Sequence, residues 1–83
     1  MTNQKVTVYG ALWCPDCRRS KKFLDDRGVP YSWVDVDADE RASAYVQQLH
    51  GGPRVIPTIV KVSGEFVAEP SDSDLAHFLG LDN

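Results

Sequence analysis

The feature that most constrains the fold is a pair of cysteines, Cys14 and Cys17, placed between two different residue patterns. Residues 5–9 alternate and are rich in β-branched and aromatic side chains, which predicts a β-strand that Gly10 ends. Residues 15–27 predict a helix, because Pro15 suits a first helical turn and Gly28 is a typical C-terminal stop. The cysteine pair therefore opens a helix directly after a strand.

The remaining patterns predict five further elements. Residues 31–36 form a second strand, and a helix capped by Asp37 or Asp39 runs to residue 49. Strands at 58–62 and 65–68 are joined by a tight turn at residues 63–64, and Ser71 with Asp74 forms a capping box for a last helix. The order is βαβαββα, in which the helix between the first two strands predicts a parallel, right-handed crossover. We therefore predict an α/β, thioredoxin-like fold with a four-stranded mixed sheet and three helices.

Size and charge limit the classes of function. The 83 residues are enough for one small domain, which we expect to span residues 1–83 as a monomer. The net charge of −3 argues against nucleic acid as a partner. No apolar stretch approaches the roughly 20 residues that cross a membrane, and the first residues lack an apolar signal region, so we expect a cytoplasmic protein. In a reducing cytoplasm, two cysteines indicate catalysis or metal binding rather than a structural disulfide.

The position of each cysteine on the predicted helix assigns it a role. Cys14 lies at the capping position, where its sulfur is expected to accept hydrogen bonds from the N–H groups of Asp16 and Cys17 and where the helix dipole stabilises a thiolate. The Asp16 carboxylate opposes that effect. Cys17 lies one turn further along, facing the sheet, and should be less exposed and more protonated. We predict that Cys14 attacks a disulfide and that Cys17 resolves the mixed disulfide.

Three other interpretations compete with redox catalysis. A metal site would combine the cysteines with His50 and His77, but their spacing matches no zinc pattern, so we expect no metal and place both histidines at the surface. The cysteines could also be two buried thiols without chemistry. A non-enzymatic adaptor of the same fold is the third interpretation; the presence of both cysteines favours an enzyme.

A second signal is Ile56-Pro57, immediately before a predicted strand. A proline there does not belong in a central strand. It is either a simple strand-start proline or a cis-proline, which would leave the neighbouring backbone open to pair with an extended substrate. Arg54, just before it, is either a substrate contact or an ordinary loop residue.

The segment around the cysteines carries further candidates. Trp13, beside Cys14, is a packing residue or a substrate contact, and we favour the contact. Arg18, Arg19, Lys21 and Lys22 form a dense basic patch on the helix. We interpret this patch as a solvated helix face, except for Arg18, which we expect close to the two sulfurs.

Together, residues 8–17, Tyr31 and residues 51–57 resemble the glutaredoxins, within the thioredoxin superfamily, and the resemblance covers nearly the whole chain. It implies a dithiol thiol–disulfide oxidoreductase in which Pro57 is cis and Ile56 offers its backbone to the cysteine moiety of a thiol substrate. The implied catalytic residues are Cys14 and Cys17. The candidate substrate-binding residues are Trp13, Pro15, Asp16, Arg54, Val55, Ile56, Pro57, Ser71 and Asp72.

The chain also departs from the glutathione-dependent members of that family. Ala11 stands where they usually have lysine, Asp16 replaces an aromatic residue, Val55 replaces threonine, and residues 69–72 (Glu-Pro-Ser-Asp) replace a Gly-Gly and acidic segment. In the family the lysine and the Gly-Gly segment bind the two carboxylates of glutathione. Trp13 and the Pro-Ser turn are instead similar to mycoredoxins, which use the sugar-linked thiol mycothiol.

The resemblance therefore implies no tightly bound cofactor and a low-molecular-weight thiol co-substrate, with mycothiol favoured over glutathione. The implied partners are disulfide-containing or S-thiolated proteins and an NADPH-dependent disulfide reductase. An alternative is a redoxin that thioredoxin reductase recharges and that reduces protein disulfides such as that of ribonucleotide reductase.

Overall fold

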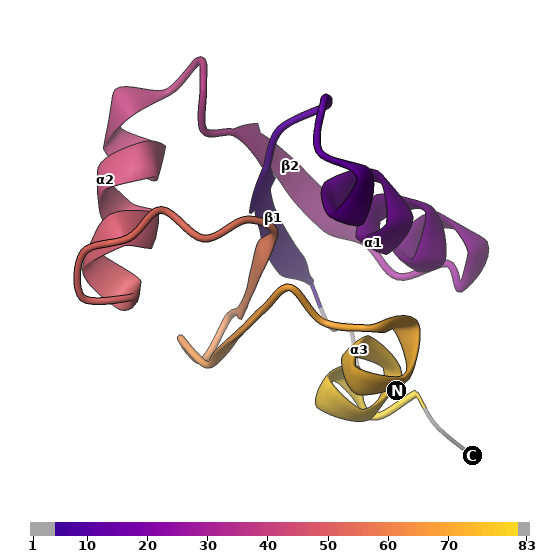
Figure 1. Ribbon diagram of the computed structural model, residues 1–83. Helices are drawn as coiled ribbons and strands as arrows, with labels where there is room; N and C mark the ends of the chain where they lie inside the picture. Colours follow the sequence, from indigo (N-terminus) through magenta and orange to yellow (C-terminus); the bar gives the residue numbers. More distant parts are fainter. Residues whose placement is uncertain (1–4, 82–83) are drawn as a thin grey trace.

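A four-stranded sheet lies between two helical layers in the computed structural model, which describes residues 5–81 (Figure 1). The predicted order βαβαββα is confirmed. In chain order the elements are β1 (Val6–Gly10), α1 (Pro15–Asp26), β2 (Tyr31–Asp35), α2 (Glu40–Leu49), β3 (Thr58–Lys61), β4 (Phe66–Ala68) and α3 (Asp72–Leu79).

The sheet is mixed, with the strand order β2-β1-β3-β4. β1 pairs with β2 in parallel, as predicted for two strands joined through a helix, whereas β3 is antiparallel to both β1 and β4. Tyr9 lies opposite Thr58 in the β1–β3 pair. This antiparallel register places the residues that precede Thr58 beside those that follow Tyr9, so the Pro57 loop lies next to the cysteine segment.

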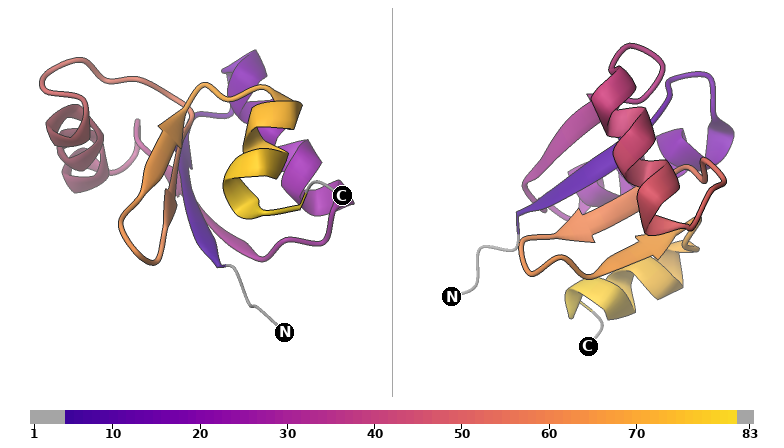
Figure 2. Two further views of the ribbon diagram at one scale, coloured as in Figure 1. Left: turned by 90° about the horizontal axis from the view of Figure 1, so that it is seen from below. Right: turned by 90° about the vertical axis from the view of Figure 1, so that its left-hand side faces the viewer.

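α1 and α3 cover one face of the sheet and α2 covers the other (Figure 2). On the first face Leu24 of α1 and Leu75 of α3 pack with Val8 and Ile59 of the sheet. On the second face α2 contributes a smaller cluster centred on Val46. Burial of each such side chain contributes about 1.5–3 kcal/mol, so the core holds α1 firmly against the sheet.

Two local predictions need correction or refinement. Gly10 does not break the first strand: it belongs to β1 as its last residue and pairs with Asp35. Of the two candidate caps for α2, the structure selects Asp39, whose carboxylate accepts a hydrogen bond from the Ala42 N–H at 3.1 Å. The Ser71 cap of α3 is confirmed, with its hydroxyl oxygen 3.0 Å from the Asp74 N–H. Between residues 5 and 81, no helix is both long enough and apolar enough to cross a membrane.

Candidate active site

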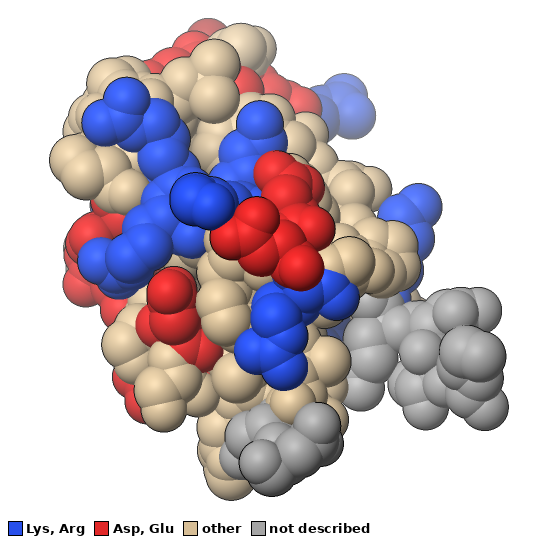
Figure 3. Space-filling model, turned by 90° about the vertical axis from the view of Figure 1, so that its right-hand side faces the viewer, with Lys and Arg blue, Asp and Glu red and all other residues tan. Residues whose placement is uncertain are grey.

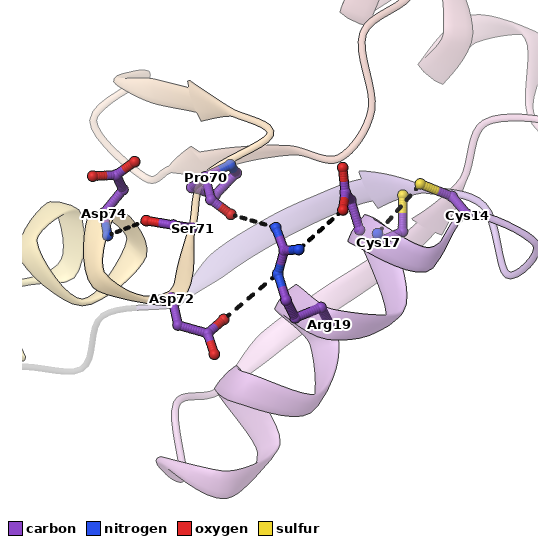
Figure 4. Close-up of polar contacts among 8 residues, drawn as sticks. Cys14, Cys17, Arg19, Pro70, Ser71, Asp72 and Asp74 are labelled. Carbon is purple, nitrogen blue, oxygen red and sulfur yellow. Dashed lines mark hydrogen bonds and ion pairs between the residues drawn. The ribbon is translucent and has the colours of Figure 1, made fainter.

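Cys14 is the N-cap of α1, as predicted. Its backbone is extended, and its sulfur accepts a hydrogen bond from the Cys17 N–H at 3.3 Å (Figure 4). Among the described residues the second bond expected, from the Asp16 N–H, is not formed. Pro15 occupies the first turn, where its missing N–H leaves no helical bond unmade. The N-terminus of α1 therefore directs a backbone donor at the Cys14 sulfur.

Cys17 is fully buried, at 0% exposure, one turn into α1. Burial raises the pKa of the Cys17 thiol, and the hydrogen bond with Cys14 raises it further. The expected contrast in burial is thus present, although Cys14 is itself only 8% exposed.

Gly10 explains how Cys17 fits so close to the sheet. A Cβ atom added at Gly10 would lie 2.8 Å from the Cys17 sulfur and 3.0 Å from the Trp33 ring. Any side chain at position 10 would therefore displace the Cys17 thiol. The glycine is required by this close approach, not by a break in the strand.

The Ile56–Pro57 peptide bond is cis, and the carbonyls on either side of Ile56 are engaged. The Thr58 hydroxyl donates to the Val55 carbonyl at 2.6 Å, and the Glu69 N–H donates to the Pro57 carbonyl at 2.8 Å. Within residues 5–81 the Ile56 N–H and carbonyl have no hydrogen-bond partner. The backbone that the resemblance assigns to a substrate is thus open.

His50 supports this loop from behind. Its Nε2 atom lies 3.0 Å from the Thr58 hydroxyl oxygen. Because that hydroxyl donates its single proton to Val55, it can only accept from His50, which places the hydrogen on Nε2. His50 is half-buried and packs edge-on against Phe66, so it is less exposed than a plain surface histidine, whereas His77 is exposed as predicted.

Trp13 and Arg54 meet through Asp37, which the sequence indicated only as a possible helix cap. The Trp13 indole N–H donates to one carboxylate oxygen of Asp37 at 2.6 Å, and Arg54 lies 2.9 Å from the other. These contacts, from Trp13 first and Arg54 second, hold the pKa of the Asp37 carboxyl below its usual range. Trp13 is still 64% exposed, so its ring is held at the surface beside Cys14.

Arg19 makes the corresponding connection on the other side of the cysteines. Its guanidinium lies 3.0 Å from Asp16 and 3.9 Å from Asp72, and it donates to the Pro70 carbonyl at 3.2 Å (Figure 4). Arg19, which the sequence indicates only as part of a solvated basic patch, therefore joins the cysteine segment to the start of α3.

Two of the sequence candidates have structural partners in this region. Ser71 caps α3 and Asp72 pairs with Arg19. Over the face that carries α1 and α3, basic and acidic side chains are interleaved (Figure 3). No cluster of three or more His, Cys, Asp or Glu side chains that could hold a metal ion occurs among residues 5–81.

Sequence reasoning assigned other roles to four residues that shape the site. They were interpreted as a strand end (Gly10), part of a solvated basic patch (Arg19), a possible helix cap (Asp37) and a surface residue (His50). Asp37 is separated from Trp13 by 24 positions, and its polar side chain after a strand gave no signal beyond a possible helix cap.

The comparisons place this geometry in a family. The sequence profile of the glutaredoxins matches residues 6–67. The chain is 40% identical over 65 residues to Mycoredoxin 1 of Corynebacterium glutamicum, which covers 78% of this chain and 80% of that protein. It is 29% identical over 75 residues to a putative glutaredoxin of Mycobacterium tuberculosis, covering 90% and 89%. The chain belongs to the glutaredoxin family.

A solved structure agrees. The crystal structure of a thioredoxin-like protein superposes with a TM-score of 0.77 at 31% identity, over 89% of this chain and 99% of that one. The thioredoxin-like fold is therefore confirmed, and the protein is a thiol–disulfide oxidoreductase that resembles the mycoredoxins.

Proposed function

We propose that Cys14 is the attacking thiolate and Cys17 the resolving thiol of a dithiol mechanism. The observation that carries the proposal is the contrast between the two sulfurs. Cys14 caps α1, and its sulfur accepts a hydrogen bond from the Cys17 N–H. Cys17 is fully buried on the side of α1 that packs against Gly10 of β1. A thiolate at a helix N-terminus is stabilised by the helix dipole, which makes Cys14 the better nucleophile.

The electron balance follows from two exchanges. The Cys14 thiolate attacks one sulfur of the substrate disulfide and forms a mixed disulfide, and the other substrate sulfur leaves as a thiolate. Cys17 then loses its proton to solvent or to a departing thiolate and attacks Cys14. The second substrate sulfur leaves, and the protein keeps the two-electron oxidation as a Cys14–Cys17 disulfide. Two molecules of a small thiol, or a reductase that draws on NADPH, restore both thiols.

The raised pKa of Cys17 supports this order of events. Part of the increase comes from Cys14 itself, through a hydrogen bond and through its charge. Forming the mixed disulfide removes that charge, so the pKa of Cys17 should fall only after Cys14 has reacted. Burial, the largest cause, does not depend on the state of Cys14, so only the part of the increase that comes from Cys14 is lost.

Two serine variants test these roles. Cys14→Ser should abolish all thiol–disulfide exchange, because no nucleophile remains. Cys17→Ser should still reduce mixed disulfides with small thiols but should reduce protein disulfides poorly. Turnover of both variants is measured on one substrate of each kind. An equal loss in the two variants on both substrates would refute the assignment.

For the electron donor we favour mycothiol or a thiol of similar chemistry over glutathione. Position 11 presents no cation, because it is a buried alanine. Glu69 with Pro70 replaces the open Gly-Gly backbone of the glutathione-dependent members. Losing one charge-assisted hydrogen bond costs about 1.5–3 kcal/mol, so two such losses lower glutathione affinity by about a hundredfold or more. The similarity to a protein named mycoredoxin supports the same choice.

One comparison separates the donors. The oxidised protein is offered glutathione with its reductase, mycothiol with its reductase, or thioredoxin reductase, each with NADPH, and NADPH consumption is followed. We expect the fastest turnover with mycothiol. Turnover with thioredoxin reductase alone would favour the redoxin alternative, in which a protein disulfide such as that of ribonucleotide reductase is the substrate. No turnover with any donor would favour the adaptor. We assign the reaction to the cytoplasm, where such donors act on S-thiolated proteins.

A further inference from the structure

Asp37 joins three loops that surround the cysteine pair. Its two carboxylate oxygens are both used: one accepts from the Trp13 indole N–H at 2.6 Å, and the other lies 2.9 Å from the Arg54 guanidinium. Arg54 also donates to the Val36 carbonyl at 3.5 Å. The Asp37 N–H in turn donates to the Asp35 carboxylate at 2.9 Å, which fixes the loop after β2. We call Trp13, Asp37 and Arg54 together the Asp37 bridge.

The bridge links the segment of Cys14 to the segment of Ile56, between which the proposed mechanism places a thiol substrate. Trp13 is next to Cys14 in the chain, and Arg54 lies two residues before Ile56, whose open backbone would pair with the substrate. Arg54 is therefore a cation within reach of groups attached to a bound thiol. Arg19, on the opposite side, already has Asp16 and Asp72 as partners.

We propose that Asp37 is a specificity-determining residue: its carboxylate occupies Arg54 and thereby denies this cation to thiols that carry free carboxylates. A carboxylate-bearing thiol such as glutathione must displace Asp37 before it can pair with Arg54. A thiol without carboxylates near its cysteine moiety is not penalised. This inference rests on the proposed function and deepens it by naming the residue that disfavours one class of thiol.

Two features make Asp37 an effective competitor. The hydrogen bonds from Trp13 and Arg54 lower the pKa of its carboxyl, because both contacts favour the charged form that competes for Arg54. The Trp13 bond also holds the carboxylate in place without using Arg54. Both members of the ion pair are partly solvent-exposed, at 31% for Arg54 and 42% for Asp37, so the competition is modest in size.

The central variant is Asp37→Asn, which keeps an amide oxygen for the Trp13 indole and removes the charge that neutralises Arg54. The reduced protein is mixed with the 2-thiopyridyl disulfide of glutathione, and with the same disulfide made from glutathione diethyl ester. Attack of Cys14 on the glutathione sulfur releases 2-thiopyridone, whose absorbance gives a second-order rate constant. We expect Asp37→Asn to increase the rate with the glutathione probe about two- to fivefold, as an exposed ion pair allows. The rate with the diester should change less.

Matched variants isolate the charge at this position. Asp26→Asn removes the same charge from an ion pair with Lys22 near the end of α1, and should leave the ratio of the two rates unchanged. Asp37→Asn combined with Arg54→Ala should lose the gain, whereas Arg54→Ala alone should change the ratio little. The gain should also shrink as salt is added.

Trp13→Phe separates charge masking from the indole contact, because it removes the indole N–H together with part of the ring and leaves the charge of Asp37 in place. If Trp13→Phe reproduces the gain, the position of Trp13 controls selectivity and the proposal is overturned. An equal gain with both probes, or with Asp26→Asn, overturns it as well. If every variant reacts and the ratio of the rates with the glutathione probe and the diester is the same in all of them, the inference is refuted and the proposed function stands. If no thiopyridone is released, the proposed function itself is refuted.

Discussion

Replacing Gly10 by alanine adds one methyl group to the contact between β1 and α1. The new Cβ would lie 2.8 Å from the Cys17 sulfur, 3.0 Å from the Trp33 ring and 3.2 Å from the Cys17 Cβ. Contacts this short force the neighbours to move, and overpacking of a core costs about 1–3 kcal/mol. Alanine recovers about 0.4–1 kcal/mol by restricting the unfolded chain. We therefore expect a net destabilisation of about 1–2 kcal/mol, which in a domain of this size lowers Tm by about 4–16 °C.

Thermal and urea unfolding of the reduced protein measure this change. A double-mutant cycle with Cys17→Ala identifies its source, because that variant removes the sulfur and leaves the Cys17 Cβ and Trp33. The penalty of Gly10→Ala should be smaller in the Cys17→Ala background. In the protein with both cysteines, displacement of the Cys17 sulfur should slow the resolving step more than the first attack by Cys14. Rapid mixing with a mixed-disulfide substrate separates the two steps.

Gly64→Ala is the matched control, because no atom lies within 4 Å of a Cβ added there. Its backbone has a φ of +100°, so any loss of stability in that variant comes from the backbone and leaves the resolving step unchanged. If Gly10→Ala destabilises the protein equally with and without the Cys17 sulfur, contact with that sulfur is not the reason for glycine at position 10.

Two further variants test the loop around Pro57. Thr58→Val should raise KM for a disulfide peptide about three- to tenfold with a smaller change in kcat, because the Val55 carbonyl and His50 lose their hydrogen-bond partner. Thr58→Ser keeps the hydroxyl and should restore KM. An unchanged KM in Thr58→Val would exclude a positioning role for Thr58. Glu69→Gly should stabilise the protein by about 0.5–1 kcal/mol in urea unfolding, since Glu69 has a φ of +49° that disfavours a side chain. Glu69→Ala should give no such gain, and an equal gain in both variants would exclude backbone strain as the cause.

The elements of the fold could be predicted because each is encoded locally. Alternation marks β1, helical spacing of Ala42 and Val46 marks α2, and Ser71 caps α3 through a bond only three residues long. Local signals become ambiguous where one residue type is compatible with two different structural roles. A glycine after a strand is equally compatible with a break and with a close approach, and only the packing of Cys17 shows which applies at Gly10.

The site was predicted less completely, because several of its contacts join loops that are far apart in the sequence. Nothing in the chain next to Asp37 indicates that Trp13 and Arg54 will meet it. The contacts of Arg19, and not Arg18, with the start of α3 also join distant parts of the chain. Successive residues point about 100° apart around a helix, and the position of α3, which decides which arginine is paired, is set by long-range packing. Cys14 and Cys17 were placed correctly because their helix cap is local.

The paired arginines change what the charges around the cysteines can do. Asp16 is held by Arg19, and Asp37 is held by Arg54. Neither arginine is therefore a free anion site, and each is available to a ligand only if the ligand competes with an aspartate. We propose that a thiol that binds here uses the open backbone of Ile56 and the exposed Trp13 ring, neither of which requires a carboxylate. Selectivity would then arise less from an added recognition group than from arginines that are already occupied, and a single aspartate substitution is enough to test that view.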